Sequence, residues 1–212
     1  TKGSEINKCT ALAVMIIIVP LVMLICLCVG STLIGPGAVV RALFIEKETV
    51  AYQIIWNIRL PRILVAGVVG MCLALSGNIL QGVLRNPLAA PNVIGVSSGA
   101  GFAGFVILIL FPDYDMFVPI GAFFGALGAT FLVYMLSWQK GAHPYRLILA
   151  GVAVSSFLGA GMSTLMIFFP ERIHGVLAFM VGGLSARSWP HFNILWPYAV
   201  IGITLSLLLP TR

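Results

Sequence analysis

The sequence WNIRLPRILVAGVVGM at residues 56–71 joins two arginines to a long apolar run. Arg59 and Arg62 stand three residues apart with Pro61 between them, and the run from Ile63 to Leu84 follows directly. About 20 apolar residues are enough for a helix to cross a bilayer. Arginine is costly inside hydrocarbon and common at its edge. The stretch therefore predicts a membrane helix whose first turn lies at the membrane surface.

The composition of the whole chain supports this interpretation. Of its 212 residues, 60% are hydrophobic and 8% are charged, whereas a soluble domain has roughly 25% charged residues. The net charge of +6 comes from basic residues scattered between apolar runs, which fits span ends and argues against binding to nucleic acid. The four cysteines lie in or beside apolar runs and indicate packing residues, with no disulfide framework.

Six stretches are long and apolar enough to span a membrane. They are Ala11–Leu33, Ile63–Leu84, Val93–Phe111, Phe117–Trp138, Leu147–Phe169 and Asn193–Pro210. Backbone groups in lipid must be satisfied within their own segment, so the sequence predicts an all-α polytopic membrane protein with about six transmembrane helices. Val176–Leu184 is apolar but too short to span, and we expect a short helix at the interface there. Tryptophans and tyrosines near span ends are interpreted as aromatic belts.

An even number of spans places both termini on one side of the membrane. Six of the twelve Lys and Arg share that side and six lie opposite, so the positive-inside rule gives no orientation. If the termini are cytoplasmic, the loops on the opposite side hold more arginine than the positive-inside rule favours. For Arg59 and Arg62 the residues leave two interpretations open: anchors at a helix start, or donors for an acidic partner.

Small residues recur every four positions in three of the predicted spans. The clearest set lies in the fifth span, and shorter sets lie in the fourth and third. These sets are Gly151, Ser155, Gly159 and Ser163; Gly121, Gly125 and Ala129; and Gly95, Gly99 and Ala103. Such stripes allow helices to approach closely. The alternative is that the stripe in the fifth span faces a translocation path.

The second span ends in a polar hinge. Asn78 and Gln81 lie in its second half, and an amide in hydrocarbon needs a partner, so this face is expected to look inward. Asn86 precedes Pro87, and Pro91 follows shortly. These prolines break any helix, which predicts a structured turn between two spans.

Several kinds of chemistry lack a sequence signal. The chain has no G-x-x-x-x-G-K-[ST] phosphate loop and no H-E-x-x-H or Cys/His cluster. No nucleophile stands out beside a base, and no carboxylate lies inside a predicted span. We therefore predict no catalytic residue, no metal site and no cofactor, and we disfavour a proton- or sodium-coupled transporter.

Four sequence blocks together carry a family resemblance. They are RLPR at 59–62, LALSGNILQGVLRNPLAAPNVIGVSSGAG at 73–101, RLILAGVA at 146–153 and MVGGLSARSW at 180–189. With these blocks the chain resembles the permease subunits of ABC importers for ferric siderophores, haem and vitamin B12, over nearly its whole length. The resemblance implies one permease domain at residues 1–212. It would be the N-terminal part of a roughly ten-helix protein, without the C-terminal spans and the ATPase-coupling loop.

The resemblance also implies partners and a mechanism. The chain would be a non-enzymatic transport subunit in the bacterial plasma (inner) membrane with a cytoplasmic N-terminus. It would work with a second permease subunit, cytoplasmic ABC ATPases and an extracytoplasmic substrate-binding protein, by alternating access. A ferric siderophore is the first expectation for the cargo, and haem and cobalamin stay open.

Site residues follow from the same resemblance. Arg59 and Arg62 would dock onto glutamates of the binding protein, which would explain the arginines opposite the termini. The turn AHPYR at 142–146 would form the inner gate, where relatives often carry small hydroxyl residues. The predicted path and gate set is Pro144, Tyr145, Gly151, Ser155, Gly159, Met162, Ser163 and Met166.

Two other classes remain as alternatives. A secondary transporter or channel would need charges or a selectivity ring inside the spans, and an ion current would reveal it. A scaffold that only binds partners would show no ATP-dependent uptake.

Overall fold

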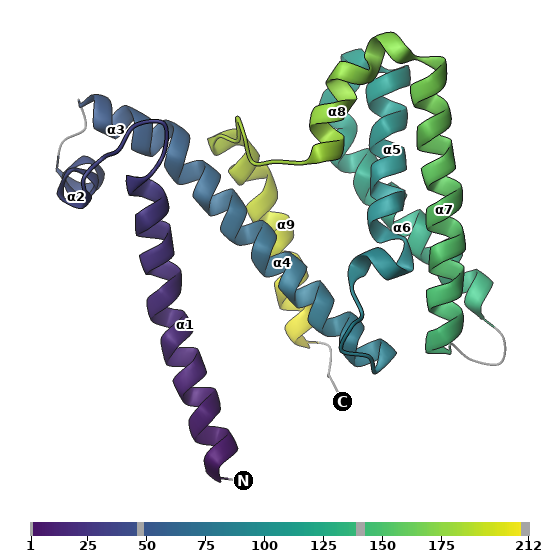
Figure 1. Cartoon of the computed structure of the whole chain (residues 1–212), viewed down its shortest axis with the longest axis horizontal. Helices are drawn as coiled ribbons and strands as arrows, with labels where there is room; N and C mark the ends of the chain where they lie inside the picture. The colour runs from purple at the N-terminus through teal and green to yellow at the C-terminus, as the bar shows by residue number, and fades with distance from the viewer. Residues whose placement is uncertain (1, 46–48, 139–142, 209–212) are drawn as a thin grey trace. The chain divides into compact units, whose positions relative to one another are not determined.

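The computed structural model describes residues 2–45, 49–138 and 143–208, and helices dominate these ranges (Figure 1). The chain divides into two compact units. Unit 1 comprises Thr1–Met71 and Leu184–Gly202, and unit 2 comprises Cys72–Gly183 and Ile203–Arg212. Two long helices belong to both units: α4 (Leu60–Leu84) and α9 (Trp189–Leu208).

Unit 1 contains α1 (Lys2–Cys28), α2 (Pro36–Phe44), α3 (Val50–Ile54), the π-helical turn η1 (Ile55–Arg59) and the first part of α4. Its core joins the end of α1 to α2 and η1. The buried members of that core are Leu27, Val39, Ala42 and Ile55.

The predicted connection between the first two spans is itself structured, because it contains α2 and α3. Pro36 is pre-organised for a first helical turn, and Val39 and Ala42 bury one face of α2. At α3 the Thr49 side chain accepts a hydrogen bond from the Tyr52 amide at 3.3 Å, which is a helix N-cap. These two short helices lie in a stretch that was predicted only as a long connection between spans.

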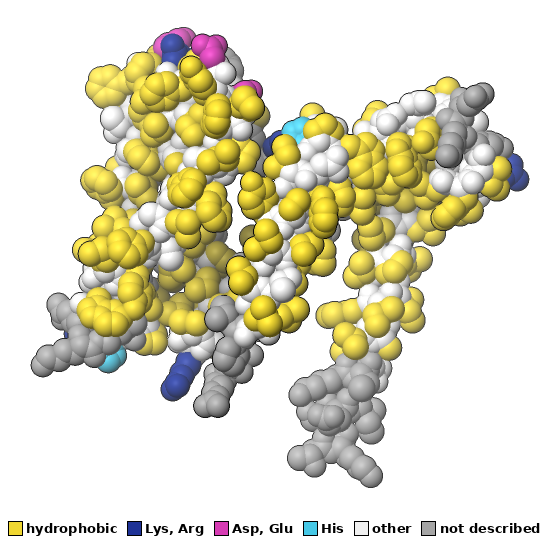
Figure 2. All heavy atoms as spheres, turned by 180° about the vertical axis from the view of Figure 1, so that it is seen from behind, with side chains coloured by type: hydrophobic (Ala, Val, Ile, Leu, Met, Phe, Trp, Pro, Cys, Tyr) yellow, Lys and Arg dark blue, Asp and Glu magenta, His cyan; other side chains and the backbone are white. Residues whose placement is uncertain are grey.

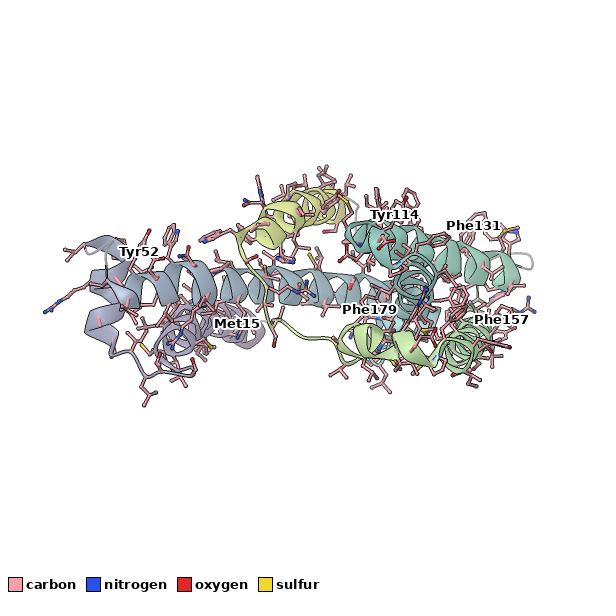
Figure 3. The ribbon with its side chains drawn as sticks, turned by 90° about the horizontal axis from the view of Figure 1, so that it is seen from above. Met15, Tyr52, Tyr114, Phe131, Phe157 and Phe179 are labelled. Atoms are coloured by element: carbon pink, nitrogen blue, oxygen red, sulfur yellow. The ribbon has the colours of Figure 1, made fainter. Side chains whose placement is uncertain are left out.

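Unit 2 is built around α5 (Val96–Leu110), α6 (Val118–Ser137), α7 (Pro144–Phe168) and α8 (Ile173–Val181). Three 3₁₀ turns belong to the same unit: η2 (Pro91–Ile94) leads from α4 into α5, η3 (Pro112–Phe117) joins α5 to α6, and η4 (Pro170–Arg172) joins α7 to α8. One core cluster joins the end of α4 to α6 and α7. A second joins α5 to α8 and includes Phe105, Ile109 and Val176. Phe179 of α8, labelled in Figure 3, packs on this second cluster.

The predicted spans correspond to observed helices. Among the residues that the structure describes, five helical segments are long and apolar enough to cross a membrane. The third predicted span is α5, which has 15 residues and a length of only about 22 Å at 1.5 Å per residue. It is short because Gly95 and Pro112 bound it. The predicted short helix after the fifth span is α8, which begins three residues earlier than expected.

Two small-residue stripes bring α5 and α6 together. A Cβ on Gly99 would lie 2.3 Å from the Gly125 carbonyl oxygen, and a Cβ on Gly125 would lie 2.4 Å from the Gly99 carbonyl oxygen. The two backbones are therefore in direct contact. For these two stripes the prediction of close helix packing is confirmed.

The helix surfaces are apolar in both units. Figure 2 shows hydrophobic side chains along the sides of the helices and charged ones near helix ends. Met15 on α1, labelled in Figure 3, is 64% exposed, and Phe157 on α7 is 77% exposed. Such faces are suited to lipid or to other helices and not to water. The chain is a multi-pass membrane protein.

Candidate functional site

The arginine pair lies beside a hollow within unit 1. The hollow has a volume of about 560 Å³ and lies between the end of α1 and the start of α4. Both Arg59 and Arg62 line it, and Leu184 contributes from the segment before α9. Its other lining residues are mainly apolar.

Arg59 is committed to internal bonds. Its side chain is only 8% exposed. Its Nη1 donates to the Leu27 carbonyl oxygen at 2.6 Å, and its Nη2 donates to the Thr32 hydroxyl oxygen at 3.1 Å and to the Thr32 carbonyl oxygen. Leu27 is in the last turn of α1, where carbonyl groups lack helical partners and a cation is favoured by the helix dipole. Arg59 therefore caps α1.

A glycine makes room for this cap. A Cβ on Gly30 would lie 2.8 Å from Nη2 of Arg59. Any larger residue at position 30 would push on the guanidinium, so Gly30 and Arg59 form one structural unit.

Arg62 differs from Arg59 in its environment. It is exposed in the first turn of α4. Its side chain has no hydrogen bond or ion pair within the described residues. The structure thus places both predicted docking residues beside one hollow, but only Arg62 presents its guanidinium to the surroundings.

The turn that carries these arginines also contacts α9. Trp189 donates its indole N–H to the Trp56 carbonyl oxygen at 2.8 Å, and the two rings lie 5.3 Å apart. Trp56 also stacks on Tyr52 at 5.9 Å. Sequence reasoning treated these aromatic residues as interfacial belts and missed the indole bond. The sequence signal for this bond was Pro61, five residues after Trp56, because proline has no backbone N–H to donate.

The polar hinge begins with a helix C-cap at the end of α4. Arg85 has the left-handed φ of 48°, its amide donates to the Gly82 carbonyl oxygen at 3.4 Å, and the Asn86 amide donates to the Gln81 carbonyl oxygen at 3.2 Å. This is the Schellman pattern. The Asn86 side chain then accepts from the Leu88 amide at 2.9 Å, across Pro87.

The amide side chains before the hinge lie on the outside of α4. Asn78 and Gln81 are both exposed within this chain. Their expected inward orientation toward further helices or a wet cavity stays a prediction.

The hinge continues into η2, which packs on α7. Gly95 has a φ of +76°, which glycine adopts without strain, and its turn starts α5. A Cβ on Gly151 would lie 1.9 Å from the Val93 carbonyl oxygen. Gly151 is therefore small because the backbone of η2 rests on it.

The other members of the α7 stripe have different environments. The Ser155 hydroxyl is buried and has no hydrogen-bond partner among the described residues. Gly159 faces open space, and the Ser163 hydroxyl donates to the Gly159 carbonyl oxygen at 3.1 Å. Only the Gly151 end of the stripe is closely packed against a backbone.

The two methionines of the predicted path lie inside unit 2. Met162 and Met166 pack against the cluster formed by α5 and α8. The sulfur of Met162 also lies 3.5 Å from where a Cβ on Gly101 would stand.

The predicted gate is at the start of α7. Pro144 occupies the first turn of α7, and Tyr145 is 57% exposed. The Arg146 Nε donates to the Tyr145 hydroxyl at 3.0 Å, and the His143 ring stacks on Tyr145 at 5.9 Å. Ala142 lies outside the described residues. An exposed aromatic and cationic cluster thus occupies this end of α7.

A second arginine cap was also missed. The Arg172 Nη1 donates to the Ile109 carbonyl oxygen in the last turn of α5, and its guanidinium lies 5.8 Å from the centre of the Phe169 ring. Arg172 therefore does for α5 what Arg59 does for α1.

The acidic residues of unit 2 that the structure describes lie in the turns between helices. Asp113 and Asp115 are exposed in η3, and Glu171 is exposed in η4. Figure 2 shows acidic and basic side chains together at one end of the helices of unit 2. Among the described residues, no three His, Cys, Asp or Glu side chains are grouped as metal ligands would be.

Comparison with known proteins gives consistent matches. Residues 15–212 match the FecCD transport family. The Fe(3+)-citrate import system permease protein YfmE of Bacillus subtilis is 37% identical over 203 residues, covering 94% of this chain and 61% of that protein. The achromobactin transport system permease protein CbrC of Dickeya dadantii is 36% identical over 190 residues, covering 87% of this chain and 54% of that protein.

A solved structure shares the fold. It is described as an inward-facing conformation of a metal-chelate type ABC transporter, with a TM-score of 0.77 and 28% sequence identity. The match covers 93% of this chain and 62% of that chain. The chain spans somewhat more than half the length of these relatives.

Proposed function

Because the chain belongs to the FecCD transport family, we propose that it is membrane-spanning permease sequence of an ABC importer for an iron complex. The observation that carries the proposal is the match over residues 15–212. This range includes the hinge and the turn that carries Arg59 and Arg62, which is called the docking turn below. The transport step is alternating access. ATP hydrolysis in separate cytoplasmic subunits drives it, and the permease itself is not an enzyme.

The proposed cargo is a ferric siderophore or a similar ferric chelate. A relative that imports Fe(3+)-citrate by name supports iron. The predicted spans carry few charges, which suits a path that binds its cargo weakly while the delivery protein binds it tightly. Haem and cobalamin are the competing cargoes.

The proposed docking site for the extracytoplasmic binding protein is this docking turn, which consists of η1 and the first turn of α4. Arg62 is exposed beside the hollow, and a guanidinium can hold a carboxylate through two parallel hydrogen bonds. Rim pairs of this kind mainly speed encounter and fix orientation. Direct docking by Arg59 would require its guanidinium to leave the Leu27 and Thr32 carbonyl groups, so we assign Arg62 the larger share of the contact. Docking at this turn implies an N-terminus on the opposite side of the membrane, in the cytoplasm.

The proposed path follows α7 and α8 toward the cluster at Pro144 and Tyr145. The exposed apolar faces of α7 and of the adjoining α6 support a second permease subunit as the neighbour. Phe157 of α7 and Phe131 of α6, both labelled in Figure 3, point away from their own unit and are 77% and 63% exposed. The transported complex would pass along the axis shared by the two permeases.

Reconstitution tests this function. The full permease, its ATPase and its binding protein are placed in proteoliposomes, and uptake of radioactive ferric citrate is measured with haemin and cyanocobalamin in parallel. We expect uptake that needs both ATP and the binding protein. Uptake or ion current without ATP would indicate a secondary transporter or channel, and no uptake of any of the three cargoes would favour a scaffold.

A further inference from the structure

We propose that Trp189 is a positioning residue for the docking turn, because its indole N–H replaces the backbone N–H that Pro61 lacks. The inference rests on the proposed docking function of Arg62. It assigns a role to a residue that composition alone would place in an aromatic belt.

The Trp56 carbonyl group lacks a backbone hydrogen-bond donor, because residue 61 is proline. In η1 the Leu60 amide donates to the Ile55 carbonyl oxygen, five residues earlier. The next bond of the same pattern would run from residue 61 to the Trp56 carbonyl oxygen. Residue 61 is proline and has no N–H. Leu60 is already engaged with Ile55, so the Trp56 carbonyl needs a donor from elsewhere, and such a need is costly to leave unmet near hydrocarbon.

The indole N–H of Trp189 supplies this donor. The Trp189 Nε1 lies 2.8 Å from the Trp56 carbonyl oxygen, which is a good hydrogen-bond distance. The indole cannot accept a hydrogen bond and has only this one N–H, so the pairing is specific. Ring contacts hold the indole in place, with Trp56 at 5.3 Å and Phe192 at 6.0 Å.

The indole is attached to the start of α9, which has hydrogen bonds of its own. Trp189 is its first residue. The preceding Ser188 contacts the His191 ring, its hydroxyl oxygen lying 3.1 Å from Nδ1, and its amide donates to the same nitrogen at 3.3 Å. The indole is thus fixed to a helix end and not to a free loop.

The bond from Trp189 to Trp56 bears on docking because it holds the turn that precedes Arg62. Arg59, the last residue of η1, is held on α1 by its bonds to Leu27 and Thr32. Trp189 holds the same turn from α9. Arg62 follows Pro61 directly, so the two attachments together set the direction of the exposed guanidinium. Loss of the indole bond should leave Arg62 present but less well aimed.

A double-mutant cycle tests the proposal in the full importer. Trp189→Phe keeps an aromatic ring and removes the N–H, while Pro61→Ala restores a backbone N–H that can donate to Trp56 in the pattern Leu60 uses. Trp196→Phe, on the same helix and 47% exposed, is the matched control. The measurement is ATPase stimulation against the concentration of binding protein.

We expect Trp189→Phe to raise the half-saturating concentration of binding protein roughly threefold to tenfold, as the loss of one hydrogen bond would, at an unchanged maximal rate. Adding Pro61→Ala should restore it to the value of Pro61→Ala alone, and Trp196→Phe should change nothing. An unchanged half-saturation in Trp189→Phe, or no rescue by Pro61→Ala, overturns the positioning role.

A further readout separates this outcome from failure of the proposed function. The indole N–H of Trp189, assigned by its absence in Trp189→Phe, should exchange slowly with solvent in the intact protein. Fast exchange overturns the bond itself. If exchange is slow but Arg62→Ala leaves half-saturation unchanged, the docking function fails, and the positioning role falls with it although the bond is real.

Discussion

Unit 1 and unit 2 hold their helices together by different means. In unit 2, α5 and α6 meet through glycines whose backbones touch. In unit 1, the end of α1, the turn η1 and the start of α9 meet through polar side chains that bond to backbone carbonyl groups. Each unit also shows one feature of the other type, since Arg172 caps α5 and Gly30 accommodates Arg59.

The difference teaches where adjustment is possible. Contact between two backbones tolerates almost no added volume. Side-chain bonds to carbonyl groups can break and reform, each at a cost of about 1 kcal/mol, or up to about 3 when the donor is charged. We therefore expect unit 2 to resist change and unit 1 to permit it, which suits a surface that must bind and release a partner.

The largest effect should come from the contact between α5 and α6. Gly125→Ala places a Cβ 2.4 Å from the Gly99 carbonyl oxygen, so the helices must separate, at a cost of about 3 kcal/mol. Gly128→Ala is the control, since Gly128 lies on the same helix with nothing within 4 Å. The thermal midpoint of the purified permease is the measurement. Equal midpoints for the two variants would show that α5 and α6 do not touch.

A smaller effect is expected where η2 rests on α7. Gly151→Ala places a Cβ 1.9 Å from the Val93 carbonyl oxygen, but η2 is a short turn that can shift, so we expect a loss of about 2 kcal/mol. Transport should fall more than stability, because the hinge and the proposed gate helix would no longer fit. Gly159→Ala, which faces open space on the same helix, should retain both uptake and midpoint. Full uptake by Gly151→Ala would mean that this contact has no part in transport.

Features that depend on local sequence patterns could be predicted from the sequence, as the helices of unit 2 show. Small-residue stripes repeat along a helix, so close packing at Gly99 and at Gly125 could be expected from spacing, whereas the pairing of these two stripes with each other could not. The long apolar runs likewise predicted the spanning helices, because length and hydropathy are local properties.

The features that were missed depend on residues far apart in the chain. Arg59 bonds to Leu27, 32 positions away, and Trp189 bonds to Trp56, 133 positions away. No periodicity relates such pairs. The RLPR motif at 59–62 predicted one docking role for both arginines, whereas the structure buries Arg59 and exposes Arg62. Two glycines of the proposed path also differ in their surroundings, since Gly151 contacts the backbone of η2 and Gly159 faces open space.

The smallest effect should distinguish the two arginines of the docking turn. Arg59→Gln removes a charged cap from α1, and we expect a loss of about 1–2 kcal/mol, seen as a lower thermal midpoint. Gly30→Ala should act in the same direction, because it displaces the same guanidinium. Arg62→Gln removes an exposed charge without internal bonds and should leave the midpoint within about 0.5 kcal/mol of the parent.

Binding should show the reverse order, and this makes the comparison decisive. Arg62→Gln should weaken stimulation by the binding protein most at low salt, since rim charges are screened as salt rises. Arg59→Gln should weaken it at every salt concentration, because the turn itself is disturbed. If Arg59→Gln keeps the parental midpoint yet loses stimulation in the salt-dependent manner of Arg62→Gln, then Arg59 leaves α1 to contact the partner directly. Of the two side-chain attachments of η1, only the Trp189 bond to Trp56 would then remain during docking.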